Sequence, residues 1–184
     1  ALTVTLAQAD MRRGYLSGAP GVLVSGLVWL AAGIVTALVS DQIGVLTLLM
    51  GGAAIHPIGV GIAKLFGASG THESGNPLGT LAGETTFWLI AGCAIAYGVH
   101  VLRIEWFVPV MLLVIGGRYV TFQTVYGLRA YWICGALLSA AGLILALTRA
   151  PSVVGALSGA AIELDFASVL LGQYAARDAT PPNS

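Results

Sequence analysis

The sequence contains six apolar runs, each about as long as a helix that crosses a lipid bilayer. They cover residues 18–39, 43–66, 77–102, 106–128, 131–147 and 152–174. About 20 mostly apolar residues are enough to span the hydrocarbon core as a helix. Only helices and closed barrels satisfy their backbone hydrogen bonds there. The runs therefore predict an all-α chain, a polytopic transmembrane bundle of six helices.

Composition excludes the other large classes of protein. Hydrophobic residues make up 57% of the chain and charged residues 9%, with a mean hydropathy of +0.89, whereas an average soluble domain has about 25% charged residues. The formal net charge is zero and no basic run is interleaved with aromatic residues, which argues against nucleic acid as a partner. We expect a single transmembrane domain over residues 1–175 with the lipid bilayer as its partner, no cofactor, and a disordered polar tail over 176–184.

Polar breaks between the runs predict how the helices connect. Residues 40–42 leave room only for a tight turn, while the Gly- and Ser-rich stretch 67–77 reads as a loop. Asn76 followed by Pro77 is typical of a helix start, because Asn76 can cap free N–H groups and proline at the first position loses no hydrogen bond. The segment from Leu2 to Asp10 is expected to lie at the membrane interface.

The basic residues predict the orientation. With six helices both termini lie on the same side, and a cytoplasmic N-terminus gives five basic residues inside against two outside. The inside set is Arg12, Arg13, Lys64, Arg129 and Arg177, and the outside set is Arg103 and Arg149. The excess of positive charge on the cytoplasmic side favours a multi-pass protein of the inner membrane with both termini in the cytoplasm.

A weak internal repeat is visible when the runs are aligned. Trp29 and Trp88 each precede a glycine by four residues, and the second and fourth runs each contain a glycine pair, Gly51-Gly52 and Gly116-Gly117. The pattern would suit three tandem helical hairpins. Small residues also occur in membrane helices simply because they allow close packing, so both interpretations stay open.

Several short motifs resemble an uncharacterised family of small bacterial integral membrane proteins. The motifs are His56-Pro57 with Gly59, Lys64, Asn76-Pro77-Leu78-Gly79, Gly117-Arg118-Tyr119 and Tyr126-Gly127. The resemblance extends over most of the chain and implies a six-helix bacterial membrane protein. It implies no catalytic or binding residue.

Ionisable residues inside the apolar runs are the candidate functional site. At about 1.5 Å per residue, Arg118 lies near the middle of the bilayer, with other ionisable groups at a similar depth. These other residues of the predicted polar layer are His56, Glu84, Glu163 and Asp165. A charge at the centre of a bilayer costs at least roughly 2.5–3.5 kcal/mol, so we expect these groups to face inward and form pairs.

The partner of Arg118 is predicted from helical geometry. Glu163 and Asp165 are two residues apart, about 200° around a helix, so they cannot face the same partner. We expect Arg118 to lie between Glu84 and Glu163, with Asp165 directed towards another cavity wall or a subunit contact in a homo-oligomer. The excess of carboxyl groups favours protonation of some of them, or a proton shared with His56.

Each of these features also has a purely structural interpretation. An arginine–glutamate pair can lock helices together without any ligand, and His56 can hydrogen-bond a carbonyl freed by Pro57. Tyr119, Gln123 and Tyr126 share one face of the fourth run, where they would line a wet cavity or bond neighbouring helices.

The polar layer favours transport of a small solute or ion, coupled to protons. A non-catalytic structural or accessory protein is the first alternative, and an intramembrane lipid-modifying enzyme is the second. The sequence has no His-Glu-x-x-His or Gly-x-Ser-x-Gly motif, so we assign no catalytic residue and no metal ligand.

Overall fold

The computed structural model describes residues 3–178, and all regular secondary structure within that range is helical. The helices are α1 (Val4–Tyr15), η1 (Leu16–Gly18), α2 (Ala19–Leu38), α3 (Asp41–Leu65), α4 (Pro77–Leu102), η2 (Ile104–Trp106), α5 (Phe107–Tyr126), α6 (Ala130–Thr148) and α7 (Ser152–Asp178). Six helical stretches in this range are long and apolar enough to cross a membrane. The predicted all-α bundle of six such helices is confirmed.

The long helices begin and end within a few residues of the predicted limits. The clearest case is α4, which begins at Pro77 with the Asn76 side chain accepting a hydrogen bond of 3.0 Å from the backbone N–H of Leu78. At the other end of the chain, α7 runs on to Asp178, beyond the expected end at residue 174. The rest of the predicted tail, residues 179–184, lies outside the described part of the chain.

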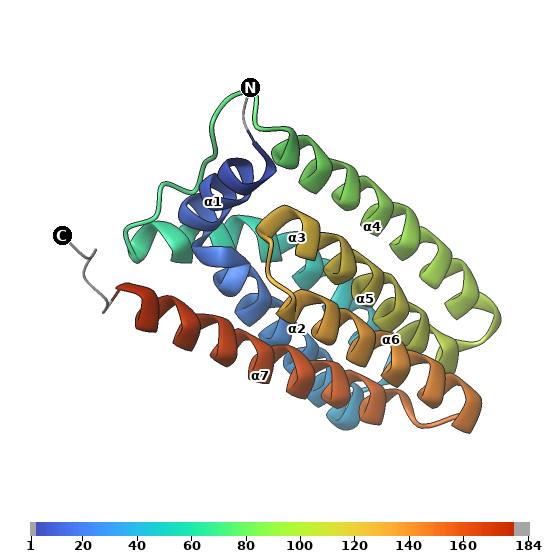
Figure 1. Cartoon of the computed structure of the whole chain (residues 1–184). Coiled ribbons are helices and arrows are strands. Elements are labelled where there is room, and N and C mark those ends of the chain that lie inside the picture. The colour runs from blue at the N-terminus through green and yellow to red at the C-terminus, as the bar shows by residue number, and fades with distance from the viewer. Residues whose placement is uncertain (1–2, 179–184) are drawn as a thin grey trace.

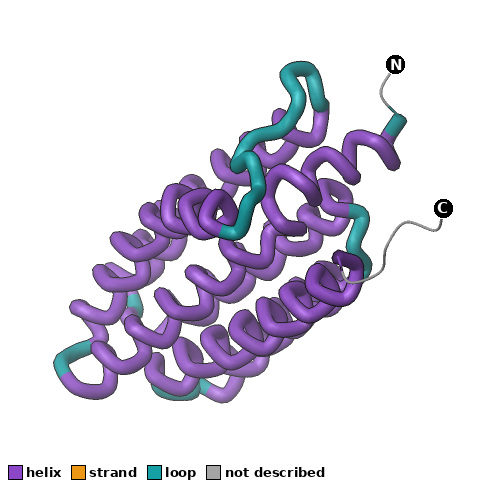
Figure 2. Tube along the Cα trace, turned by 90° about the vertical axis from the view of Figure 1, so that its left-hand side faces the viewer, coloured by secondary structure: helices purple, strands orange, loops and turns teal. Residues whose placement is uncertain are grey.

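The helices α2 to α7 run side by side along one axis (Figure 1). Neighbours in the bundle follow the order α3, α2, α7, α6, α5 and α4. Consecutive helices do pair as α2–α3, α4–α5 and α6–α7, but α2 with α7 and α5 with α6 pack more closely than α6 with α7. The loops gather at the two ends of the bundle, as Figure 2 shows.

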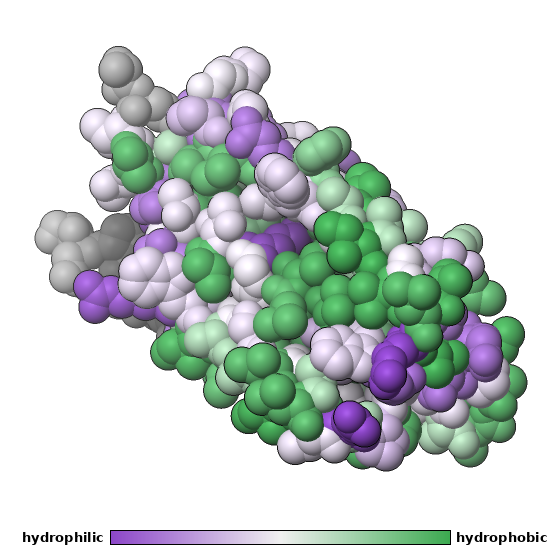
Figure 3. Space-filling model, turned by 90° about the vertical axis from the view of Figure 1, so that its right-hand side faces the viewer, coloured by the Kyte–Doolittle hydropathy of each residue, from purple (hydrophilic) through white to green (hydrophobic). Residues whose placement is uncertain are grey.

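Helix α4 is the most peripheral of these helices. It packs mainly against α5, and only 17% of its most apolar stretch is buried, against 44% for α7. Hydrophobic residues cover much of the side of the molecule seen in Figure 3. A surface of this kind places the bundle in contact with lipid.

Helix α1 lies across one end of the bundle, against α5, α4 and α3. The Gln8 side-chain amide donates to the carbonyl of Thr124 at 2.9 Å, and the guanidinium of Arg12 donates to the carbonyl of Tyr126 at 2.6 Å. These two carbonyls belong to the last turn of α5, where helical carbonyls lack partners within the helix. The predicted interfacial segment is thus a helix that caps α5.

The loop between α3 and α4 holds α1 from the other side. The Asn76 side chain donates to the carbonyl of Ala7 at 3.0 Å and to the carboxylate of Asp10 at 2.7 Å. That carboxylate also accepts from the backbone N–H of Glu73 at 3.0 Å. Asn76 therefore both starts α4 and ties α1 to it.

Candidate functional site

Arg118 lies on the side of α5 that faces α4. Its Nη2 donates a hydrogen bond of 3.2 Å to the hydroxyl of Thr86 on α4, and its guanidinium carbon lies 5.1 Å from the centre of the Phe122 ring. The Thr86 hydroxyl donates to the carbonyl of Ala82 at 3.2 Å, which orients its oxygen towards the arginine. The guanidinium is held between two helices, roughly 12 Å from the C-terminal end of α5 at about 1.5 Å per residue.

A groove of about 360 Å³ opens between α4 and α5 beside Arg118. Its walls are mostly apolar, and Arg118 carries the only charge among the described residues that line it. The lining residues are Thr85, Trp88, Leu89, Ala91, Gly92 and Ile95 of α4, and Leu113, Val114, Gly117, Arg118 and Thr121 of α5. At Gly117 no atom lies within 4 Å of the place a Cβ would occupy, so the floor of the groove stays open next to the arginine.

The predicted pairing of Arg118 with Glu84 and Glu163 is not formed. Glu84 is exposed on α4, and Glu163 is fully buried on α7. Among the side chains of residues 3–174, no carboxylate lies within ion-pair distance of Arg118, whereas Arg103 and Glu105 form an ion pair of 3.5 Å at the far end of α4. Equal depth in the bilayer did not predict proximity, because depth leaves the direction of a side chain around its helix undetermined.

Glu163 is enclosed among four helices. The polar side chains that face its carboxyl group are those of Ser25 and Trp29 on α2 and Tyr119 on α5, and Cys134 on α6 also faces it. Neither carboxyl oxygen has a hydrogen-bonding partner at bonding distance in the described part of the chain, and the same holds for Nε1 of Trp29. Of the predicted polar layer, the structure places Glu163 beside the predicted cavity residue Tyr119.

The other members of the predicted polar layer point outward. His56 on α3, Glu84 on α4 and Asp165 on α7 are all exposed. They lie on three helices, of which α3 and α7 are separated by α2. The single inward-facing layer expected for them is therefore absent from the described chain.

Two of the predicted cavity residues on α5, Tyr119 and Tyr126, belong to an aromatic cluster, and neither they nor Gln123 line the groove. Tyr119 and Tyr126 are buried, and Gln123 is half-buried. The rings of Tyr119 and Tyr126 pack against Tyr131 at centroid distances of 5.9 and 5.4 Å. Phe122 and Phe166 complete this cluster.

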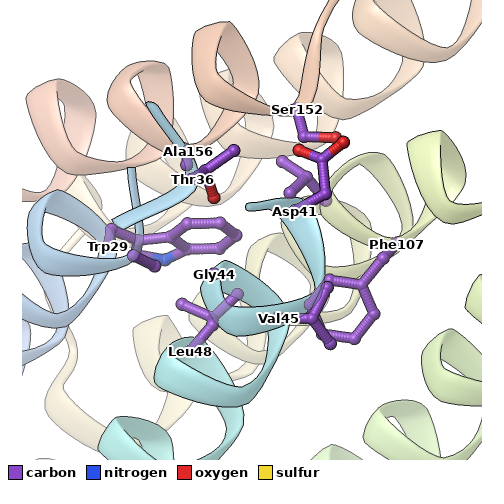
Figure 4. A pocket seen from close by; sticks show the side chains of 11 residues that line it. Trp29, Thr36, Asp41, Gly44, Val45, Leu48, Phe107, Ser152 and Ala156 are labelled. Atoms are coloured by element: carbon purple, nitrogen blue, oxygen red, sulfur yellow. The ribbon is translucent and has the colours of Figure 1, made fainter. Parts of the chain in front are cut away.

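A second, much smaller pocket lies between α2, α3, α5 and α7. Its volume is about 10 Å³, close to the minimum that holds one water molecule. Figure 4 shows the Trp29 ring in one wall and the Asp41 carboxyl group directed towards the Ser152 side chain in another. Trp29 thus contributes to this pocket as well as to the surroundings of Glu163.

Sequence reasoning missed Ser25, Trp29 and Tyr131 as parts of the polar and aromatic core. Ser25 and Trp29 are four residues apart on α2, so both side chains lie on one face of the helix. That spacing was the available signal, since a serine and a tryptophan on the face opposite a buried acid offer it hydrogen-bond donors. As for metals, the described residues contain no group of three or more His, Cys, Asp or Glu side chains that could hold an ion.

Comparison with known proteins places the chain in a family. No curated protein and no solved structure matches it. One family model does match, and it covers residues 4–173, which is nearly all of the described chain. The chain belongs to DUF7010, a family of unknown function.

Proposed function

We propose that this protein transports a small amphipathic anion and binds it at Arg118 in the groove between α4 and α5. The observation that most directly supports this proposal is that no carboxylate of the described side chains pairs with Arg118, which lies beside a groove of about 360 Å³. A structural arginine in a membrane is normally paired. An arginine without a carboxylate is free to bind the anionic group of a ligand.

The groove matches the chemistry of such a ligand. A guanidinium has five N–H donors, and one hydrogen bond to the Thr86 hydroxyl leaves others for a carboxylate, sulfonate or phosphate. The aliphatic and aromatic walls suit an apolar body of modest size. An ion without an apolar part would leave these walls without a contact.

The position of α4 suggests how the ligand enters. Because α4 packs mainly on α5 and is otherwise largely exposed, a small movement of α4 would widen the groove towards the bilayer. An amphipathic anion that already partitions into the membrane would reach Arg118 sideways. Release to the other side would require a second position of α4, which transport by alternating access supplies.

Arg118→Met is expected to weaken anion binding by about tenfold or more, because hydrogen bonds to a charged group contribute about 1.5–3 kcal/mol. Octanesulfonate is a suitable ligand because it stays charged at all working pH values. Binding is measured in lipid nanodiscs by the change in fluorescence of Trp88, which lines the groove. Arg118→Lys keeps the charge without the planar fork and is expected to show an intermediate loss.

Three controls complete the binding experiment. Trp88→Phe should remove the fluorescence change, 1-octanol should test whether the alkyl chain alone is enough, and inorganic sulfate should test the charge alone. Equal affinity of the wild type and Arg118→Met for octanesulfonate would contradict the proposal. Uptake of labelled octanesulfonate into proteoliposomes, lost in Arg118→Met, then distinguishes transport from binding alone.

A non-catalytic accessory role is the second candidate. It is favoured by the exposure of Glu84 and Asp165 within membrane-spanning helices, because a carboxyl group facing lipid is costly and a partner helix would cover it. A second copy of the chain would meet this need. If the protein stays monomeric at every concentration in detergent and in nanodiscs, this candidate loses its support.

We further propose that the protein lies in a bacterial cytoplasmic membrane with both termini in the cytoplasm, as the distribution of basic residues favours. Single cysteines at Asp41 and Glu105 are then expected to react with a membrane-impermeant maleimide in intact cells. A cysteine at Ser69, in the loop beside α1, should react only after lysis. Labelling of the Ser69 variant in intact cells would show that the orientation is the reverse of the one proposed.

A further inference from the structure

Glu163 is a buried acid that the proposed anion site does not use. Its side chain has an exposed fraction of 0%, and it lies on the inner face of α7, near the middle of the helix. Arg118 is directed into the groove towards α4, whereas Tyr119, the next residue of α5, is directed towards Glu163. The acid and the groove therefore lie on different sides of α5.

No cationic side chain of the described residues faces Glu163. The groups that face its carboxyl are the hydroxyls of Ser25 and Tyr119, the indole N–H of Trp29 and the thiol of Cys134. Two of these groups, those of Tyr119 and Cys134, are titratable, and both are neutral when protonated. Neither oxygen of Glu163 makes a hydrogen bond in the described chain.

An ionised carboxylate in such a place is strongly disfavoured. Removal of a charge from water without an opposite charge or hydrogen bonds costs far more than burial of the neutral acid. The carboxyl group therefore holds a proton in the arrangement described. The neighbouring side chains nevertheless offer three O–H and N–H donors, from Ser25, Tyr119 and Trp29, and small rotations would direct these donors to the oxygens of an anion.

We infer that Glu163 is an exchangeable proton-binding site in the core of the bundle, and that Ser25, Trp29 and Tyr119 hydrogen-bond its carboxylate when the proton leaves. When the proton leaves, the O–H bond of the acid breaks, the proton passes to water, and the carboxylate keeps the electron pair. The small pocket next to Trp29 has room for about one water molecule and reaches Asp41 at one end of α3. This pocket shares Trp29 with the surroundings of Glu163, so a water molecule in it could carry the proton away.

The same helix connects this proton site to the anion site. Arg118 and Tyr119 are adjacent on α5, so rotation or displacement of α5 on anion binding would move the Tyr119 hydroxyl relative to Glu163. A proton carried together with a monovalent anion makes the transported pair neutral. This coupling rests on the proposed function, whereas the proton site itself does not.

Infrared spectroscopy of the full chain in liposomes tests the proton site without any ligand. The wild type is expected to show a carbonyl band of a protonated carboxylic acid that shifts in heavy water and is absent from Glu163→Gln. Asp165→Asn is the matched control, since Asp165 lies two residues away on the same helix and is exposed. It should retain the Glu163 band.

Two spectroscopic results would contradict the proposed proton site at Glu163. A difference spectrum between the wild type and Glu163→Gln that contains only carboxylate bands would show that Glu163 is ionised and would overturn the inference. A protonated band that does not shift in heavy water would show that the proton does not exchange, which also contradicts it. Tyr119→Phe gives a second measurement if Glu163→Gln does not fold, because loss of the facing hydroxyl should shift the frequency of the band.

Transport measurements test the coupling separately. In proteoliposomes, an inward proton gradient is expected to accelerate octanesulfonate uptake by the wild type and by Asp165→Asn. Glu163→Gln should exchange octanesulfonate across the membrane but lose its response to the gradient. No uptake by the wild type would refute the proposed transport and leave the infrared result standing, whereas a gradient response retained in Glu163→Gln would refute the coupling.

Discussion

Replacement of Gly116 by leucine is expected to destabilise the bundle strongly, while the same replacement at Gly117 leaves its stability nearly unchanged. A Cβ at Gly116 would lie 2.7 Å from the carbonyl oxygen of Gly135 on α6 and would also collide with the Ser139 hydroxyl. At Gly117 nothing lies within 4 Å of that position. Gly117→Leu is therefore the matched control for Gly116→Leu.

The size of the effect follows from the backbone contact. Extra methylene groups forced into a packed core cost about 1–3 kcal/mol, and more where the obstacle cannot move. The obstacle here is the backbone of α6, and the contact is reciprocal, since a Cβ at Gly135 would lie 2.6 Å from the carbonyl oxygen of Gly116. We expect a loss of about 3 kcal/mol or more for Gly116→Leu, measured by thermal melting in detergent. Equal melting temperatures for the two variants would show that α5 and α6 are further apart than described.

The same comparison applies to the other glycine pair. A Cβ at Gly51 would lie 2.6 Å from the Val28 side chain, whereas Gly52 has nothing within 4 Å. Gly52 and Gly117 are therefore not close helix contacts, whereas Gly51 and Gly116 are. One glycine of each pair allows close packing, which supports the packing interpretation of these glycine pairs.

Hydropathy was enough to predict the six helices, and a capping signature was enough to predict the start of α4. The Asn76-Pro77 signature fixed the start of α4 because it depends only on local hydrogen bonds and on the shape of proline. These signals are local. They require no knowledge of which helices are neighbours.

These local signals could not predict which way each polar side chain faces. Helical geometry showed that Glu163 and Asp165 must face apart, but it could not say which one faces the core. That choice depends on the packing of α7 against α2, which buries Glu163 and leaves Asp165 exposed. The prediction that Glu84 faces inward was based on the assumption that a single chain buries all of its own charged side chains. Glu84 is exposed, so this assumption is wrong.

Tyr131→Ala is the second change with a large expected effect. Tyr131 has an exposed fraction of 0%, and its ring contacts four others: those of Tyr119, Phe122, Tyr126 and Phe166. Removal of a buried aromatic ring costs about 3–5 kcal/mol, and here it would leave a cavity between α5, α6 and α7. Trp132→Ala is the matched control, because Trp132 is the next residue and is 53% exposed; its melting temperature should stay close to that of the wild type.

Tyr131→Phe separates the ring from its hydroxyl. The hydroxyl donates a hydrogen bond of 2.7 Å to the carbonyl of Ser17, which lies in the turn between α1 and α2 where Leu16 and Ser17 both have positive φ. Such backbone angles are unfavourable for these residues and persist only where their surroundings hold them. Because the variant leaves a buried carbonyl unpaired, we expect a loss of about 1–3 kcal/mol and faster hydrogen exchange in α1, with α6 still protected. Faster exchange in α6 without a change in α1 would show that Tyr131 acts through packing alone.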